Sequence, residues 1–131
     1  MVIVDTTVWI DYFRAISNPE TEWLDVELGR QRLGLTDVIL CEVLQGVRDE
    51  HTAVVVERRL LRLQVFRSGG LELASDAARN YRLLRSRGRT VRKTIDCLIA
   101  TFCIREQHAL LHRDRDFDPF EQLLELAVVH P

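Results

Sequence analysis

Five acidic side chains occupy places where an α/β fold puts its chemistry. One ends the first apolar run, one interrupts an apolar helical stretch, one opens a later helix and two follow an apolar strand near the end of the chain. They are Asp5, Glu42, Asp96, Asp114 and Asp116. In open parallel sheets the ligand site lies beyond the carboxyl ends of the strands. The five acids are therefore candidates for a single site at that edge.

Each of these acids also has an ordinary structural explanation. Asp5 can cap a helix, Glu42 can lie on a solvated helix face, and Asp96 can interact with a helix dipole. Asp114 and Asp116 can belong to a polar loop. Gathered together, however, the carboxylates would repel one another and raise some of their pKa values unless a divalent cation neutralised them. Oxygen ligands without His or Cys suit Mg²⁺ or Mn²⁺, and such a site can activate water for phosphodiester hydrolysis.

The elements that must position these acids alternate along the chain. Apolar runs predict strands at residues 2–4, 33–35, 64–66, 109–111 and 126–129. Helical periodicity predicts helices at residues 8–13, 21–30, 37–44, 51–63, 73–86, 95–106 and 118–124, with Thr36 and Thr94 as N-caps and Gly46 as a helix end. This order predicts an α/β fold of three layers, α/β/α, around a mostly parallel central sheet. Right-handed crossovers would bring the strand ends to one edge.

Composition limits the class of protein. The 131 residues, of which 47% are hydrophobic, predict one domain spanning 1–131. No apolar run approaches the ~20 residues of a membrane span, and the opening run is too short for a signal peptide. Three cysteines (Cys41, Cys97 and Cys103) favour neither a disulfide framework nor a zinc site. We expect a cytoplasmic protein, with Cys41 and Cys97 facing its core.

A basic segment precedes Asp96. No acid occurs between residues 77 and 95, and phosphate contacts dominate affinity for nucleic acids. Candidates for contacts to an RNA backbone are Arg85, Arg87, Arg89, Arg92 and Lys93. The alternative is a solvated helix face. Tyr81 and Trp9 can stack on bases, although such aromatic residues more often pack in a core.

Four motifs resemble those of PIN-domain proteins, in order and in spacing. They are Val4–Asp11, Thr36–Gly46, Arg85–Gly88 followed by Thr94–Ala100, and Leu110–Phe117. The resemblance extends over nearly the whole chain, and the length is similar to that of the VapC toxins of bacterial toxin–antitoxin modules.

The resemblance implies an endoribonuclease that depends on Mg²⁺ or Mn²⁺ and cleaves RNA by attack of metal-activated water on a phosphodiester. Carried over, Asp5, Asp96 and Asp114 would hold the cation, and Glu42 and Asp116 would complete the catalytic acids. Thr6 resembles the small hydroxyl residue that accompanies the first Asp. Which of Asp114 and Asp116 is the fourth acid stays open, and the arginines at 113 and 115 are expected to offset their charge.

The resemblance also implies partners. A cognate VapB-type antitoxin would hold the enzyme inactive in a heteromeric complex and would provide its only link to operator DNA; a homodimer is expected too. Apolar residues of the first helices (Trp9, Ile10, Phe13 and Trp23) suggest a groove for an antitoxin helix. One alternative is a non-catalytic PIN-like module that binds RNA or protein. A receiver-like phosphoacceptor domain is disfavoured, because the only lysine, Lys93, precedes a helix. The identity of the RNA, the bond cleaved and the number of metal ions stay open.

Overall fold

A four-stranded parallel sheet forms the centre of the protein. The computed structural model describes residues 1–131, and its strands are β1 (Val2–Val4), β2 (Leu33–Thr36), β3 (Gln64–Phe66) and β4 (Ala109–Leu111). Their order across the sheet is β3-β2-β1-β4. Val2 is in register with Leu33 of β2 and Ala109 of β4. The pairings β1–β2, β1–β4 and β2–β3 are all parallel. The predicted parallel sheet is confirmed.

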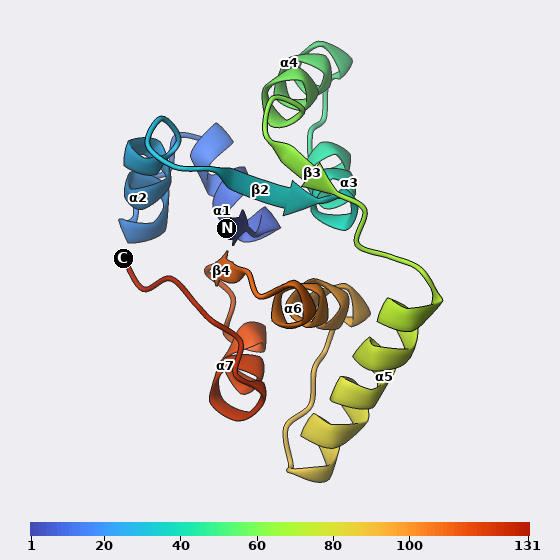
Figure 1. The fold of residues 1–131 in the computed structure, drawn as a ribbon. Coiled ribbons are helices and arrows are strands. Elements are labelled where there is room, and N and C mark those ends of the chain that lie inside the picture. The colour runs from blue at the N-terminus through green and yellow to red at the C-terminus, as the bar shows by residue number, and fades with distance from the viewer.

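Helices cover both faces of this sheet. They are α1 (Thr6–Phe13), α2 (Pro19–Glu27), α3 (Asp37–Gln45), α4 (Glu50–Leu60), α5 (Leu71–Ser86), α6 (Thr94–Glu106) and α7 (Asp118–Leu124), with a short 3₁₀ helix, η1 (Arg115–Phe117). In Figure 1, α4 lies above β2 and β3, α2 and α3 flank β2 on its left and right, and α5, α6 and α7 lie below these two strands. The predicted three-layer α/β/α architecture is confirmed.

The apolar residues of strands and helices meet in one core of 25 buried side chains. On β1 and β4, Ile3, Val4 and Leu110 are completely buried because the sheet is covered on both faces. On α3, Ile39 and Val43 are four residues apart and both face the sheet, as helical periodicity requires. No helix is both long and apolar enough to cross a bilayer.

Caps decide where several helices begin. The side chain of Thr36 accepts a hydrogen bond from the Ile39 amide at 3.3 Å, and α3 ends at Gly46, as predicted. Three helices, α1, α2 and α5, begin two residues earlier than predicted. Asp5 caps α1 directly, and Asn18 with Pro19 opens α2 through a capping box.

Three predictions were wrong. Thr94 does not cap α6 but is its first residue, and the N-cap is Lys93, without a side-chain bond. Residues 126–129 make only a single bridge, between Val128 and Leu110, because Glu125 adopts a left-handed conformation after a very short helix. Cys41 is exposed, since it is two residues from the buried Ile39 and so lies on another side of α3. Cys97 is buried as expected.

Candidate acidic site

Four of the predicted acids line one open cleft of about 360 Å³ at the carboxyl ends of β1 and β4. They are Asp5, Glu42, Asp96 and Asp114, and Thr6, Thr7 and Lys93 line the cleft beside them. The acids come from four different parts of the chain: the end of β1, α3, the first turn of α6 and the loop after β4. The parallel sheet is what brings these segments to a common edge.

Thr7 fixes the first acid. Asp5 is only 2% exposed, and its Oδ2 accepts hydrogen bonds from the Thr7 amide at 3.1 Å and the Thr7 hydroxyl at 2.7 Å. The same hydroxyl oxygen accepts a bond from the Arg113 amide at 3.1 Å. Thr7 therefore ties the end of β1 to the loop that follows β4. Thr7 was not among the predicted site residues, although a second hydroxyl two residues after Asp5 is a usable sequence signal.

Thr6 holds the second acid. Its hydroxyl donates a 2.7 Å hydrogen bond to Glu42 Oε1, across 36 residues of chain. Glu42 is half-buried, so a fully solvated helix face does not describe its surroundings. Thr6 was expected to accompany Asp5, but its hydroxyl bonds Glu42, and the hydroxyl that contacts Asp5 is that of Thr7.

The remaining three acids form the tightest cluster. Asp96, Asp114 and Asp116 each offer a carboxylate oxygen, and these oxygens lie within 4.8 Å of one another. Asp114 Oδ1 accepts a bond from the Asp116 amide at 2.9 Å, and the Asp114 amide donates to His112 Nδ1 at 3.0 Å. Asp114 and Asp116 both belong to this cluster, and of the two only Asp114 also lines the cleft.

Two oxygens of this cluster have no protein partner. Asp96 Oδ2 and Asp116 Oδ2 are buried and accept no hydrogen bond. A buried polar atom without a partner costs free energy, and native proteins rarely leave one unused. Unpartnered oxygens in an all-carboxylate cluster fit Mg²⁺ or Mn²⁺, which take oxygen ligands.

The electrostatics are those of crowded carboxylates. Burial, together with the charges of Asp5 and Asp114, raises the pKa of Asp96 to about 7. The pKa of Asp5 is raised to about 6, because burial and the charge of Glu42 outweigh the lowering effect of the hydrogen bonds from Thr7. A cation bound among these groups would favour their charged forms.

The cations that offset this charge come from the basic segment. Arg92 Nη2 lies 3.1 Å from Asp116 Oδ1, and Lys93 Nζ lies 3.7 Å from Asp114 Oδ2. Arg113, by contrast, pairs at 3.3 Å with Asp11, away from the cluster. The expectation that the arginines at 113 and 115 neutralise these acids was therefore wrong. The side chains of Arg113 and Asp114 point to different partners because the chain turns directly after β4.

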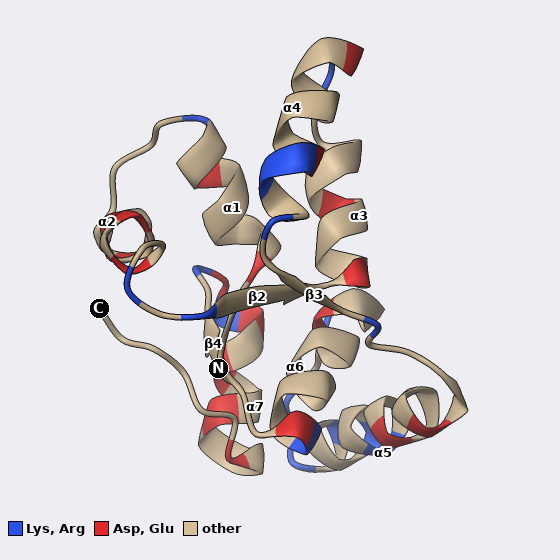
Figure 2. Cartoon of the chain, turned by 45° about the horizontal axis from the view of Figure 1, so that its top comes forward, with Lys and Arg blue, Asp and Glu red and all other residues tan.

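The other candidate RNA contacts lie along α5 and the loop that follows it. In Figure 2, basic residues mark the end of α5 and its connection to α6. The Arg85 guanidinium lies 5.5 Å from the centre of the Tyr81 ring, Arg89 donates to Gln122 at 2.8 Å, and Arg87 is exposed.

Trp9 belongs to the core. It is 2% exposed, and its ring stacks on Phe13 with the centroids 5.9 Å apart. Because the ring is buried, it is unavailable to a base, and it cannot face a partner protein either.

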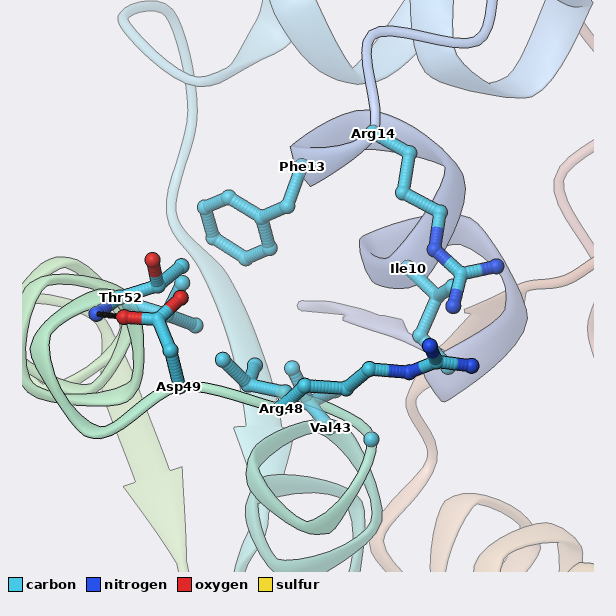
Figure 3. A pocket seen from close by; sticks show the side chains of 10 residues that line it. Ile10, Phe13, Arg14, Val43, Arg48, Asp49 and Thr52 are labelled. Atoms are coloured by element: carbon cyan, nitrogen blue, oxygen red, sulfur yellow. Dashed lines mark hydrogen bonds between the residues drawn. The ribbon is translucent and has the colours of Figure 1, made fainter.

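A second groove, of about 260 Å³, lies between α1, α3 and α4 and adjoins the acidic cleft, with which it shares Ile10 and Gly46. Figure 3 shows Phe13, Ile10 and Val43 on its walls, with the side chains of Arg14 and Arg48 along one side. Neither arginine takes part in an ion pair. Ile10 and Phe13 of the predicted apolar set line this groove, whereas Trp9 and Trp23 do not.

Comparison with known proteins gives one consistent result. The family model described as PIN domain matches residues 2–122. The chain is 33% identical over 128 residues to a VapC ribonuclease of Mycobacterium bovis and to the ribonuclease VapC11 of Mycobacterium tuberculosis. Each alignment covers 96% of this chain and 96% of the relative.

Solved structures share the fold. A chain of the VapBC2 complex of Rickettsia felis, bound to a DNA fragment from its promoter, aligns with a TM-score of 0.78 at 15% identity. The alignment covers 98% of each chain. A chain of VapBC-1 from nontypeable Haemophilus influenzae aligns with a TM-score of 0.74 at 16% identity and covers 98% of this chain and 97% of its own.

Proposed function

The chain belongs to the PIN-domain family, within its VapC group, and from this premise we propose that it is a metal-dependent endoribonuclease controlled by a VapB-type antitoxin. One observation carries the proposal. In a cluster built only of carboxylates, Asp96 Oδ2 and Asp116 Oδ2 are buried and have no partner. We take residues 1–131 as one PIN domain that performs this reaction.

Asp5, Asp96 and Asp114 are the residues that would hold the cation, since their carboxylates line one cleft. When bound, Mg²⁺ or Mn²⁺ supplies Lewis-acid chemistry that lowers the pKa of water and offsets the charge of a reacting phosphate.

The chain's own groups orient the reaction. Thr7 holds Asp5 Oδ2, and Thr6 holds Glu42 Oε1. Glu42 then offers its Oε2 to accept the proton of the attacking water. Arg92 and Lys93 lie at the rim of the acids, where they can hold the RNA backbone on either side of the scissile bond. Attack of this water on phosphorus breaks the bond to the 3′-oxygen, which takes a proton from solvent water while Glu42 returns its proton to solvent; the products carry a 5′-phosphate and a 3′-hydroxyl.

The test is cleavage of total RNA by the purified chain with Mn²⁺, with EDTA, and with Asp96→Asn in place of the wild type. We expect discrete fragments with 5′-phosphate ends only with metal and an intact Asp96. Glu57→Gln, which changes an exposed acid on α4, is the matched control and should cleave normally. RNA binding without turnover in either metal would instead support the alternative of a non-catalytic PIN-like module.

The antitoxin is proposed to occupy the groove of Figure 3. Ile10, Phe13 and Val56 form the apolar part of its lining. The unpaired Arg14 and Arg48 at its edge outnumber the one acid, Asp49, so the groove suits an apolar helix that also carries acidic residues. Coexpression with the neighbouring gene should yield a larger, inactive complex. Sedimentation of the chain alone tests whether it also forms a homodimer.

A further inference from the structure

A larger cavity, about 580 Å³, lies between α5 and α6. Its volume is in the range of pockets that hold small ligands, roughly 300–1,000 Å³. The buried Val91 and Cys97 and the half-buried Leu98 give it an apolar floor. None of its residues belongs to the four acids of the catalytic cleft.

The cavity combines an aromatic ring with guanidinium groups. Tyr81 is half-buried, and the Arg85 guanidinium lies 5.5 Å from the centre of its ring. Proteins hold unpaired RNA bases by stacking them on aromatic rings or on arginine planes. An apolar floor with a stacking partner on its wall suits a flat base better than a flexible chain.

The charge of the cavity is entirely positive. Arg82, Arg85 and Arg92 line it, and no acidic residue does. Arg82 and Arg85 form no ion pair. Arg79, on the same helix, is instead paired with Asp76 at 2.8 Å. The unpaired guanidinium groups thus gather at the cavity and would attract the phosphates that flank a bound base.

The cavity also adjoins the acidic cluster. Arg92 lines the cavity and bonds Asp116 Oδ1 through two nitrogens, at 3.1 and 3.3 Å. On α6, Asp96 lines the cleft and the next residue, Cys97, lines the cavity. A strand whose scissile phosphate lies at the acids would therefore pass a nearby nucleotide over the cavity.

We propose that this cavity is a nucleobase subsite, which holds one unpaired base of the RNA strand beside the bond to be cleaved. The inference rests on the proposed ribonuclease function and adds to it a preference for single-stranded RNA. Tyr81 and Arg85 would stack against the base, and Arg82 and Arg92 would hold its phosphates.

Binding without turnover tests the subsite. The full chain carrying Asp96→Asn is titrated into a labelled single-stranded RNA decanucleotide, and binding is followed by fluorescence anisotropy. The titration is repeated with a series of the same decanucleotide in which each member lacks the base at a different position. Base stacking is worth about 1–3 kcal/mol per base, or about 5- to 150-fold in Kd. In the parent protein, removing the base at one position of the RNA should raise the Kd by such a factor. We expect Tyr81→Ala to raise the Kd for intact RNA by the same factor. Removal of that base should then have no further effect on the Kd of this variant. Tyr81→Phe should bind as its parent does, and Arg58→Ala, an exposed arginine on α4, is the control.

The outcomes separate the two proposals. If the wild type cleaves RNA but Tyr81→Ala binds every oligonucleotide as tightly as its parent, the subsite is wrong and the nuclease stands. Unchanged RNA affinity with an altered sedimentation coefficient would assign the cavity to contact between two copies, which also overturns it. If the wild type neither binds nor cleaves RNA, the proposed function itself fails. Circular dichroism of each variant excludes loss of fold as the cause.

Discussion

Replacing Asp96 by Asn should stabilise the metal-free protein while it destroys the nuclease. Asp96 is 5% exposed, and its Oδ2 has no partner. Its neighbours in the cleft, Asp5 and Asp114, are also acids. Without a cation, the ionised carboxylate therefore lowers the free energy of unfolding, whereas an uncharged amide of the same shape does not.

The magnitude follows from the pKa of Asp96, which rises from 3.8 to about 7. At 1.36 kcal/mol per unit, the shift corresponds to about 4 kcal/mol for complete ionisation. The cleft is open to water, which screens part of this repulsion, and the new amide also lacks a partner. We therefore expect a gain of about 2 kcal/mol in the free energy of unfolding at pH 8.

The gain has a definite pH dependence. The folded state binds the Asp96 proton more tightly than the unfolded chain does, so this group's contribution to stability falls as pH rises from about 4 to about 7. The variant should match the wild type near pH 4 and exceed it most above pH 7. Urea denaturation in EDTA across pH 4 to 8 measures this directly, with Glu57→Gln as the exposed control.

Added Mn²⁺ should reverse the order. The wild type then gains stability by binding the ion, and Asp96→Asn gains much less because it has lost a ligand. A variant that is less stable than the wild type at pH 8 in EDTA would refute the reasoning. An advantage as large at pH 4 as at pH 8 would refute it as well, since it could not come from ionisation.

Three further predictions concern other residues. Thr6→Val removes the 2.7 Å bond to Glu42; we expect at least a tenfold loss in cleavage rate with under about 2 kcal/mol lost in urea denaturation, and normal cleavage would contradict a positioning role. Arg92→Ala removes an exposed arginine from a largely buried carboxylate, Asp116, so stability should fall by under about 2 kcal/mol, while the log–log salt slope of RNA binding should become shallower by about 1; an unchanged slope would exclude a phosphate contact. Val47→Asp puts a charge in the groove of Figure 3 and should abolish copurification with the antitoxin while RNA cleavage persists.

The layered fold could be predicted because its signals are local. Short apolar runs separated by amphipathic helices identify a parallel sheet, and the caps Thr36 and Gly46 lie where their residue types favour them. The failures are also local. Thr94 reads as a cap, but the chain enters α6 through Lys93 in an extended conformation. Val128 reads as part of a strand, but only one bridge forms.

The candidate site was predictable in part. Residue types and strand ends identified the acids, and the fold places four of them around one cleft. Their partners were harder to predict, because the contacts join segments far apart in the chain. Lys93 reaches Asp114, and Arg92 reaches Asp116 across 24 residues. No periodicity within one element carries that information.

The bond between Thr7 and the Arg113 amide joins residues 106 apart in the sequence. The bond lies where β1 pairs with β4. Because β2 and β3 lie between these two strands in the sequence, β1 can pair with β4 only after both have been synthesised. Asp5 is synthesised long before Asp114 and its loop. A nascent chain that has not reached Asp114 therefore carries Asp5 and Glu42 without the loop that completes their cleft. The order of the strands thus makes assembly of the acidic cleft a late event in the synthesis of this domain.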